Sequence, residues 1–304
     1  MADEELPFRK DIDFAYGVPS ELAPGVRRIV ANNPSPFTYK GTNTYLLGRG
    51  HSLALIDPGP TDDVHFDAIM KAAEGAQITH VLITHTHHDH TDGLERLIAA
   101  TGAKTCGFGR VAIDRGSKRT SPSGGEFVDR DFRPDIALKD GDRFDGDGFV
   151  LTALHTPGHA PDHLCFALEG TGATFSGDHV MAWNTSVVAP PEGNMGDYMA
   201  ALERLLERND DVYFPGHGGR ALQPQRLVKA YMLHRRMREQ SILDCIRQGK
   251  RIISDIVPVV YRDLDPRLVT AASLSIAAHV EHLVGRGLVI SEGPVTNPTR
   301  LSAV

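Results

Sequence analysis

The sequence of 304 residues is 41% hydrophobic and 23% charged, and its formal net charge is −7. This composition is typical of a soluble globular protein, and the absence of a run of about 18 uninterrupted apolar residues argues against a membrane-spanning chain. The three cysteines are too few for a disulfide scaffold, and the start MADEELPFRKD is unlike a secretion signal, so we expect a cytoplasmic protein without membrane contact.

Short strands separated by turns are predicted for the first part of the chain. Residues 42–48 and 51–57 have the pattern of paired strands, with a glycine-containing turn between them. Residues 62–74 show helical apolar spacing, with Thr61 and the aspartates that follow it as N-cap candidates. The β-branched run ITHVLIT at 78–84 predicts a buried strand.

The segment THTHHDHTDG at 84–93 connects that strand to a predicted amphipathic helix that ends at Gly102. Four of its histidines and aspartates follow the spacing H-x-H-x-D-H and are the candidate metal ligands, namely His85, His87, Asp89 and His90. Loops at the carboxyl ends of strands are where α/β sheets collect ligands. Burying this many polar groups without a metal is costly, so we interpret the segment as functional rather than structural.

The remainder of the first unit alternates strands and helices. We predict a long loop at 104–135 that borders the active site, because this stretch is rich in glycine, serine and arginine. Strands followed by turns are predicted within 149–158 and 173–178, then a helix over 197–209 and a strand over 212–214. This alternation favours a layered α/β architecture with mixed sheets.

The character of the sequence changes near Pro224. Residues 224–304 hold 12 Lys and Arg against 7 Asp and Glu, a net +5, which leaves −12 for residues 1–223. Three helical patterns and a short strand after Gly287 predict a winged helix. The third pattern is almost uncharged in its middle, which favours packing or a homodimer over contact with a nucleic-acid groove. We therefore predict a catalytic domain over 1–223 and a winged-helix-like domain over 224–304.

Further histidines and aspartates recur at predicted strand-end turns, namely His159, Asp178 and His217. Imidazoles supply neutral nitrogen ligands, and carboxylates supply the charge that balances a cation. In an extended turn His85 and His87 project to one side, so the other two ligand residues of the motif reach a neighbouring position. The pattern favours two ions bridged by an aspartate, as in two-metal hydrolases.

The motifs THTHHDH, TPGH, SGD and PGHG, in this order, resemble those of the metallo-β-lactamase superfamily. The resemblance implies a four-layer αββα sandwich with a dinuclear site at one edge. It implies that His85, His87 and His159 hold the first metal. Asp89, His90 and His217 would hold the second, with Asp178 as the bridge. Asp57 would support the metal loop without binding metal. The tail resembles the winged-helix extension of the subgroup named for β-lactamase-like protein 2.

Other polar and aromatic residues have less specific interpretations. Asp89 and His163 are the candidate catalytic residues, although His163 matches no ligand position and a supporting hydrogen bond is favoured over a catalytic role. Structural or supporting roles are expected for His88, His155 and His179. Surface or ordinary helix positions are expected for His51, His65, His234, His279 and His282. Pocket lining and core packing both remain open for Trp183, Asn184 and Tyr198.

Three functions are compatible with this site. In the first, a metal-bridging hydroxide attacks an ester, thioester or related acyl bond of a small substrate. The alternative is an endoribonuclease, because a member of the resembled subgroup acts on single-stranded RNA and Arg235, Arg236 and Arg238 offer positive charge. The third is a non-hydrolytic redox or binding protein.

The charge of −12 on residues 1–223 and the 7% aromatic content argue against RNA. We therefore favour hydrolysis of a small substrate. For a ligand set of nitrogen and oxygen atoms, two zinc ions are our first choice, with iron or manganese as alternatives.

Overall fold

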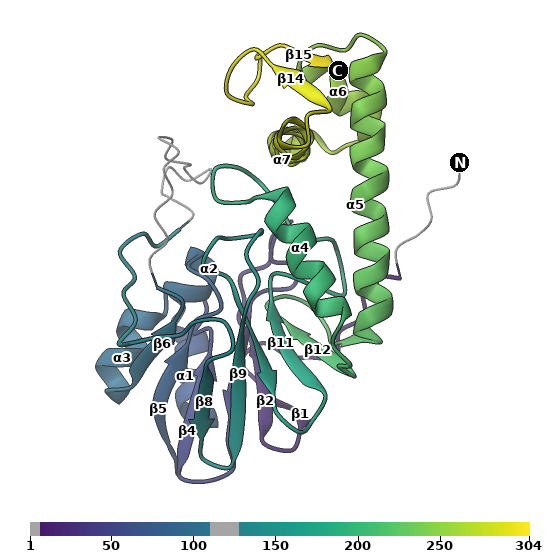
Figure 1. Cartoon of the computed structure of the whole chain (residues 1–304). Coiled ribbons are helices and arrows are strands. Elements are labelled where there is room, and N and C mark those ends of the chain that lie inside the picture. The colour runs from purple at the N-terminus through teal and green to yellow at the C-terminus, as the bar shows by residue number, and fades with distance from the viewer. Residues whose placement is uncertain (1–6, 110–127) are drawn as a thin grey trace.

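Two mixed β-sheets lie face to face in the computed structural model, which describes residues 7–109 and 128–304 (Figure 1). The first sheet has, in spatial order, β1 (Ser20–Ala23), β2 (Val26–Val30), β3 (Asn43–Leu47), β4 (Ser52–Ile56), β5 (Gln77–Leu82), β6 (Lys104–Gly107) and β7 (Ile136–Ala137). The second has β13 (Ala221–Leu222), β12 (Val212–Pro215), β11 (Ala173–Gly177), β10 (Leu164–Leu168), β9 (Phe149–His155) and β8 (Arg143–Gly146). Both contain parallel and antiparallel pairs, which confirms the predicted mixed sheets.

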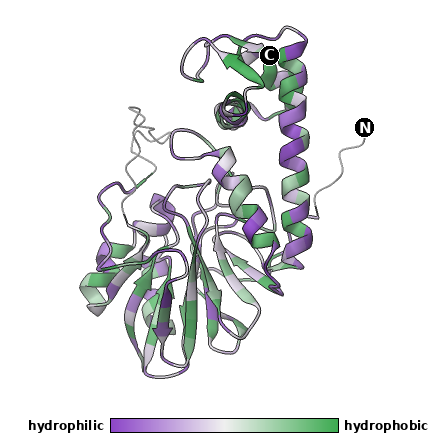
Figure 2. Cartoon of the chain, in the orientation of Figure 1, coloured by the Kyte–Doolittle hydropathy of each residue, from purple (hydrophilic) through white to green (hydrophobic). Residues whose placement is uncertain are grey.

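The main core lies between the sheets. Along β3, Tyr45 and Leu47 point into this core, while Leu46 between them points to the outer side. Phe166 and Phe175 contribute from the second sheet. Figure 2 shows hydrophobic residues concentrated on these strands. Because strands such as β3 are buried on both faces, each sheet needs a helical layer on its outer side.

Helices supply those outer layers. Helices α1 (Asp63–Ala72) and α3 (Leu94–Thr101) cover the first sheet, while α4 (Met195–Leu206) and the start of α5 (Pro224–Arg247) cover the second. Asp62 caps α1 by accepting a hydrogen bond from the backbone N–H of His65 at 2.6 Å. Helix α3 ends at Gly102 in the left-handed region, as predicted. The predicted αββα sandwich is confirmed.

The predicted loop at 104–135 is wrong at its start, because residues 104–107 form strand β6. Thr105 and Cys106 are buried, and β6 pairs in parallel with β5. Its β-branched and apolar residues favour a strand, and the glycines that follow it in the sequence obscured this preference. Much of the predicted loop, 110–127, lies outside the described residues. At its far end, the backbone N–H of Asp129 donates to the Thr86 carbonyl at 2.7 Å, so the segment does reach the histidine motif.

The tail forms a second core of its own around α6 (Ile253–Val260), a 3-10 turn (Pro266–Leu268), α7 (Val269–Gly285) and the hairpin of β14 (Val289–Ser291) and β15 (Leu301–Ala303). Ile246, Ile256 and Ile276 meet there. The second wing strand was not predicted, because residues 301–303 are too few to show a strand pattern.

By length and composition alone, one helical stretch among the described residues, Pro266–Gly285, could cross a membrane. It includes α7, whose Ile276, Val280 and Leu283 are buried in the tail core. The apolar residues of this helix therefore pack against other parts of the same chain.

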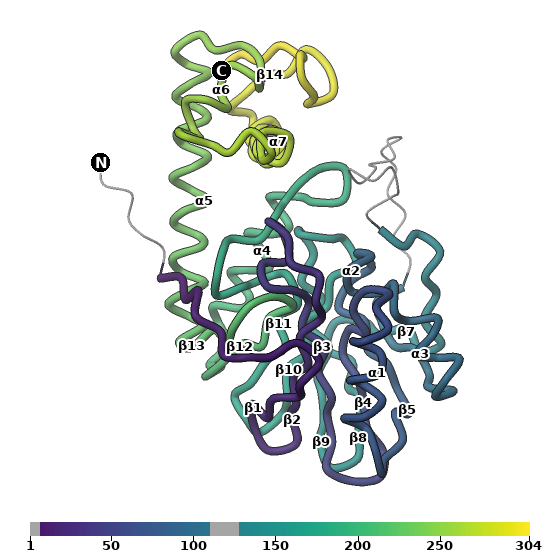
Figure 3. Tube along the Cα trace, turned by 180° about the vertical axis from the view of Figure 1, so that it is seen from behind, coloured from purple at the N-terminus to yellow at the C-terminus, as the bar shows by residue number. Residues whose placement is uncertain are grey.

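Helix α5 belongs to both parts of the molecule. Its first half, including Leu227 and Tyr231, is buried against α4 and the second sheet, and its last turns, including Ile242, enter the tail core. Figure 3 shows the N-terminal segment passing from beside α5 toward β1, and the N–H of Arg9 donates to the Ala182 carbonyl at 2.7 Å. The division at residue 223 stays a prediction.

Candidate metal centre

The histidine motif begins where β5 ends, and strand register brings Asp57 beside it. Ile56 of β4 lies opposite Leu82 of the parallel strand β5, so the residues that follow both strands are neighbours. The Asp57 carboxylate accepts hydrogen bonds from the Thr84 backbone N–H at 2.8 Å and from the Thr84 hydroxyl at 2.7 Å. Asp57 has a φ of 54°, which turns the chain away from the strand. The expected support of the metal loop by Asp57 agrees with these contacts.

Three histidines converge on one point. His87 Nδ1 lies 2.9 Å from His85 Nε2 and 3.0 Å from His159 Nε2, and the two Nε2 atoms are 3.3 Å apart. Burial lowers the pKa of His87 to about 3, and it also lowers the pKa values of His85 and His159. The three rings are therefore neutral at pH 7, which is the state that binds a cation.

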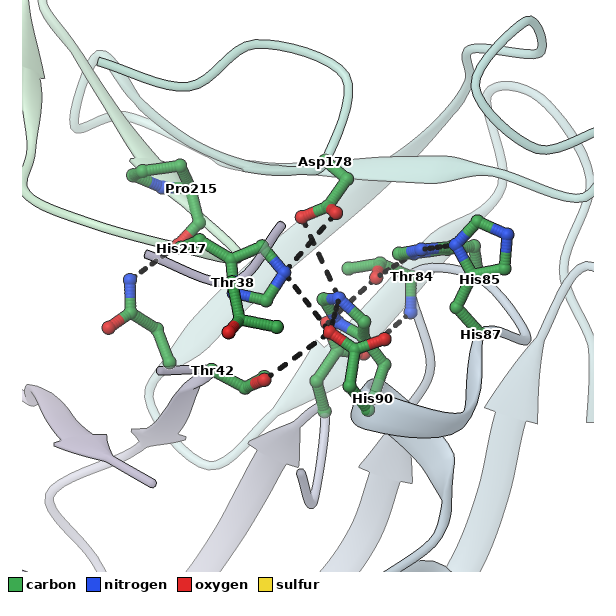
Figure 4. A network of polar contacts seen from close by, with 12 residues as sticks. Thr38, Thr42, Thr84, His85, His87, His90, Asp178, Pro215 and His217 are labelled. Carbon is green, nitrogen blue, oxygen red and sulfur yellow. Dashed lines mark hydrogen bonds and ion pairs between the residues drawn. The ribbon is translucent and has the colours of Figure 1, made fainter. Parts of the chain in front are cut away.

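A second group lies beside the first, and Asp178 lies between them (Figure 4). The members of the second group are Asp89, His90 and His217. The His217 Nε2 atom is 3.2 Å from Asp89 Oδ2 and 3.3 Å from Asp178 Oδ2. The His90 Nε2 atom is 3.5 Å from Asp89 Oδ2 and 3.6 Å from Asp178 Oδ1. Asp178 Oδ2 is also 3.7 Å from His159 Nε2, so this carboxylate faces both groups.

Proton positions in the two groups are set by acceptors outside them. His85 Nδ1 contacts the Thr84 hydroxyl at 3.0 Å, His159 Nδ1 contacts the Val187 carbonyl at 2.6 Å, and His217 Nδ1 contacts the Gly41 carbonyl at 3.3 Å. A carbonyl can only accept, and the Thr84 hydroxyl, whose own proton goes to Asp57, accepts as well. These rings therefore carry a proton on Nδ1 and direct Nε2 to the centre. This arrangement is the usual support of metal-bound histidine.

The residues fit a pair of divalent cations. His90 Nε2 and Asp178 Oδ1 are buried and have no hydrogen-bond partner among the residues that the structure describes. Burial lowers the pKa of His90 and of His217, but the surrounding carboxylates outweigh it, raising the His90 pKa well above its usual value and the His217 pKa to about 9. Negative charge therefore exceeds what neutral imidazoles can balance, and a cation would replace these protons.

All seven residues that we expected to bind metal lie at this centre, and His163 lies behind it. His163 Nε2 accepts the backbone N–H of Asp178 at 3.1 Å, and its Nδ1 donates to the Thr156 hydroxyl at 2.8 Å. Both ring nitrogens are thus bonded to the protein, and burial lowers the pKa of His163 well below its usual value. This geometry disfavours the predicted catalytic role and favours positioning of Asp178.

Histidines beside the ligands do not join the centre. His88 is half exposed and bonds Asp92 at 2.6 Å, and His155 bonds the Pro161 carbonyl at 2.9 Å. His179 is buried next to the Tyr198 ring. These positions agree with the structural or supporting roles expected for them.

Two histidines that we expected at ordinary surface or helix positions are in fact buried. His65 Nε2 lies 2.8 Å from the Thr44 hydroxyl under the Asp57 turn, and His279 is buried between α5 and α7. Both lie on the buried face of their helix, one turn from Ile69 in α1 and from Ile276 in α7, so the apolar spacing of each helix was the available sign of burial.

Two aromatic candidates and one basic candidate are buried, namely Tyr198, Trp183 and Arg235. Tyr198 is fully buried and donates to the His179 carbonyl at 2.8 Å, and Trp183 stacks on Tyr39. Arg235, expected to attract phosphodiesters, is only 4% exposed and donates to the Ser186 carbonyl. Arg236 is exposed and pairs with Glu203. The Arg235 interpretation was therefore wrong, because a charged residue on a long helix was assumed to face solvent.

Sequence reasoning missed two polar residues that form hydrogen bonds to the centre or to the turn beside it. The Thr42 hydroxyl lies 3.5 Å from Asp89 Oδ2, and Asn43 donates to the carbonyls of Pro215 at 2.8 Å and Gly218 at 2.9 Å. The two Asn43 bonds connect the start of β3 to the turn that carries His217. The polar run GTNT before an apolar strand was the available sign.

Comparison with known families agrees with this geometry. Residues 38–217 match the model of the metallo-beta-lactamase superfamily, and residues 253–295 match the beta-lactamase associated winged helix domain. Both models lie where the sandwich and the tail are found.

Similar proteins cover most of the chain. Lactamase-like protein adaB of Aspergillus niger is 34% identical over 74% of this chain, which spans 65% of that protein's length. A beta-lactamase-like protein 2 homolog of Drosophila melanogaster is 32% identical over 88% of this chain and 90% of that protein. A beta-lactamase domain protein from Burkholderia ambifaria has the same fold, with a TM-score of 0.81 at 22% identity over 97% of this chain and 96% of that one. The chain is therefore a member of the metallo-beta-lactamase superfamily with a C-terminal beta-lactamase associated winged helix domain.

Proposed function

We propose that this protein hydrolyses an ester, thioester or related acyl bond of a small substrate, using two divalent metal ions. The observation that carries the proposal is the position of Asp178, whose carboxylate faces His159 on one side and His90 and His217 on the other. When bound, divalent ions in such a site polarise a carbonyl oxygen and activate water.

The chain's own residues prepare this chemistry. Asp57 and the Val187 carbonyl hold the protons of His90 and His159 on the outer nitrogens, at 2.8 and 2.6 Å. His163 fixes the backbone of Asp178. Because these contacts exist before substrate binds, the ligands need not reorganise during turnover.

Ligand type is compatible with zinc, our first choice of metal, but does not select it. The two groups offer only imidazole nitrogens and carboxylate oxygens, which suit zinc, iron and manganese, and they contain no thiolate that would select a soft ion. A similar structure, 25% identical and with a TM-score of 0.51, was solved in a di-iron-bound form. We therefore treat iron as the main alternative.

Three observations favour acyl over phosphodiester chemistry. An atrochrysone carboxyl ACP thioesterase from Claviceps purpurea is 28% identical over 85% of this chain and 76% of that protein. Arg235, one of the cations that an RNA substrate would have used, is buried against Ser186. The net charge of −12 on residues 1–223 would further repel a polyanion.

A substrate panel tests the proposal. Metal-replete and chelated protein would be assayed on a thioester, an ester, a lactone, a phosphodiester and single-stranded RNA. Asp178→Asn protein, purified in the same way, controls for contaminating hydrolases. We expect turnover of an acyl substrate that disappears on chelation and returns with added zinc. Activity on RNA alone, falling steeply with salt, would overturn the proposal in favour of a ribonuclease.

A further inference from the structure

Helix α5 contacts the segment that connects the bridging residue Asp178 to α4. The Tyr231 hydroxyl donates to the Met181 carbonyl at 2.6 Å and accepts the Met181 N–H at 3.2 Å. It also contacts the carbonyl of Asn184. Tyr231 is fully buried, so these bonds are shielded from water.

One helical turn later, Arg235 contacts the same segment. Its guanidinium donates to the Ser186 carbonyl and lies 5.3 Å from the centre of the Tyr198 ring. The Ser186 hydroxyl donates to the His179 carbonyl at 2.8 Å. Arg235 is only 4% exposed, and its Nε atom has no hydrogen-bond partner among the described residues. Burying a guanidinium in this way is costly, which argues that its contact with Ser186 has a use.

The residue after Ser186 contacts a predicted metal ligand. The Val187 carbonyl accepts the Nδ1 proton of His159 at 2.6 Å, and this bond turns the unprotonated Nε2 toward His85 and His87. The Ser186 and Val187 carbonyls belong to successive peptide units joined at the Val187 Cα, so a shift of the first would be passed to the second.

We propose that Arg235 and Tyr231 are positioning residues of the metal centre, which act through the Ser186–Val187 backbone on His159. The inference rests on the proposed role of His159 as a metal ligand. It gives α5 a role beyond connecting two domains, since the helix that leads into the winged-helix tail also holds the orientation of one imidazole. Loss of either contact would lower the affinity for the ion held by the three histidines. The affinity for the ion at Asp89, His90 and His217 would change less.

Metal affinity tests this inference without relying on activity. The full chain is stripped of metal and titrated with zinc against a chromophoric chelator, and the absorption spectrum of the cobalt-substituted protein is recorded. Arg235→Met and Tyr231→Phe are the test variants. Arg236→Met is the matched control, because Arg236 is the next residue on α5 and is exposed.

We expect Arg235→Met to lower the affinity for one of the two ions by about tenfold, which is the lower end of the range for partners of metal-bound histidines. The variant should also change the cobalt spectrum. Tyr231→Phe should act in the same direction with a smaller effect, and Arg236→Met should match the wild type. Wild-type affinities and an unchanged spectrum in both test variants would overturn the inference, even if turnover fell. If Arg235→Met does not fold, Tyr231→Phe alone decides.

The same titration separates this inference from the proposed function. If the wild type binds no stoichiometric metal, the proposed function fails and the positioning role fails with it. If the wild type binds two ions and both test variants behave like Arg236→Met, only the positioning role is wrong.

Discussion

His90 donates its Nδ1 proton to the Asp57 carboxylate at 2.8 Å, and both side chains are almost completely buried. This bond fixes one proton on Nδ1 and directs Nε2, whose own proton a cation would replace, toward Asp89 and Asp178. Asp57 binds the Thr84 backbone as well, so one carboxylate fixes both the start of the metal loop and the tautomer of a ligand within it.

Asp57→Asn is predicted to lower the metal affinity of the group that contains His90 by about 10- to 100-fold. The amide can still accept one hydrogen bond, but its NH2 group would face the Nδ1 proton of His90 and force the other tautomer. Zinc titration of the metal-free protein measures the loss. Asp92→Asn, which removes an aspartate from the half-exposed pair with His88, is the control. Equal affinities in the two variants would show that Asp57 does not set the tautomer.

Asp178→Asn is predicted to lower the metal content below two ions per chain and to reduce hydrolysis. The amide lacks the negative charge that both groups share through the two carboxylate oxygens. Elemental analysis and the rate on the best substrate of the panel measure the two effects. A variant that retains two ions and the full rate would contradict the bridging role.

His163→Ala is predicted to retain both ions and to slow turnover by about tenfold, because the amide of Asp178 loses its acceptor while no ligand is removed. Metal content and kcat are measured together. His155→Ala, which removes a histidine from the same turn, is the control and should keep the wild-type rate. Loss of an ion in His163→Ala would instead identify His163 as a ligand.

The free energy of unfolding of the metal-free protein is predicted to fall as the pH is lowered from about 6.5 toward 4. Burial lowers the pKa of His65 from 6.5 to about 4, although Asp62 opposes the shift. The unfolded chain therefore binds a proton in this window that the folded chain does not, and His65 alone accounts for roughly 3 kcal/mol.

Chemical denaturation at several pH values checks this dependence. His65→Gln should have a smaller loss of stability between pH 6.5 and 4 than the wild type, whatever its stability at pH 7. The exposed His51→Gln is the control. A slope in His65→Gln equal to that of the wild type would rule out His65 as a source of the pH dependence.

The mixed sheets and the candidate ligands could be predicted from local patterns, whereas the four-layer sandwich and the assignment of ligands to two metals came from the resemblance to the family. The alternation of His85 and His87 and the position of the motif after an apolar run indicated both the strand end and two adjacent groups of ligands. The expected extended turn ends at His87, however, because the next residues form the short helix α2 (His88–Thr91), from which Asp89 and His90 project. The helix stop at Gly102 likewise follows from a single residue that tolerates a positive φ.

The supporting contacts could not be predicted, because they join residues that are far apart in the chain. Val187 acts on His159 through a carbonyl that every residue possesses, so its sequence carries no sign of this role. Arg235 looked like a surface cation because helical periodicity does not reveal which face of α5 meets the loop before α4. His65 of α1 contacts Thr44 of strand β3, which is distant in the sequence, so this contact could not be predicted.

Anomalous X-ray diffraction from crystals of the zinc-loaded protein tests the central claim most directly. The account predicts two peaks per chain, one among His85, His87 and His159 and the other among Asp89, His90 and His217, with the Asp178 carboxylate between them. A single peak, or metal bound elsewhere with these imidazoles bare, would contradict it.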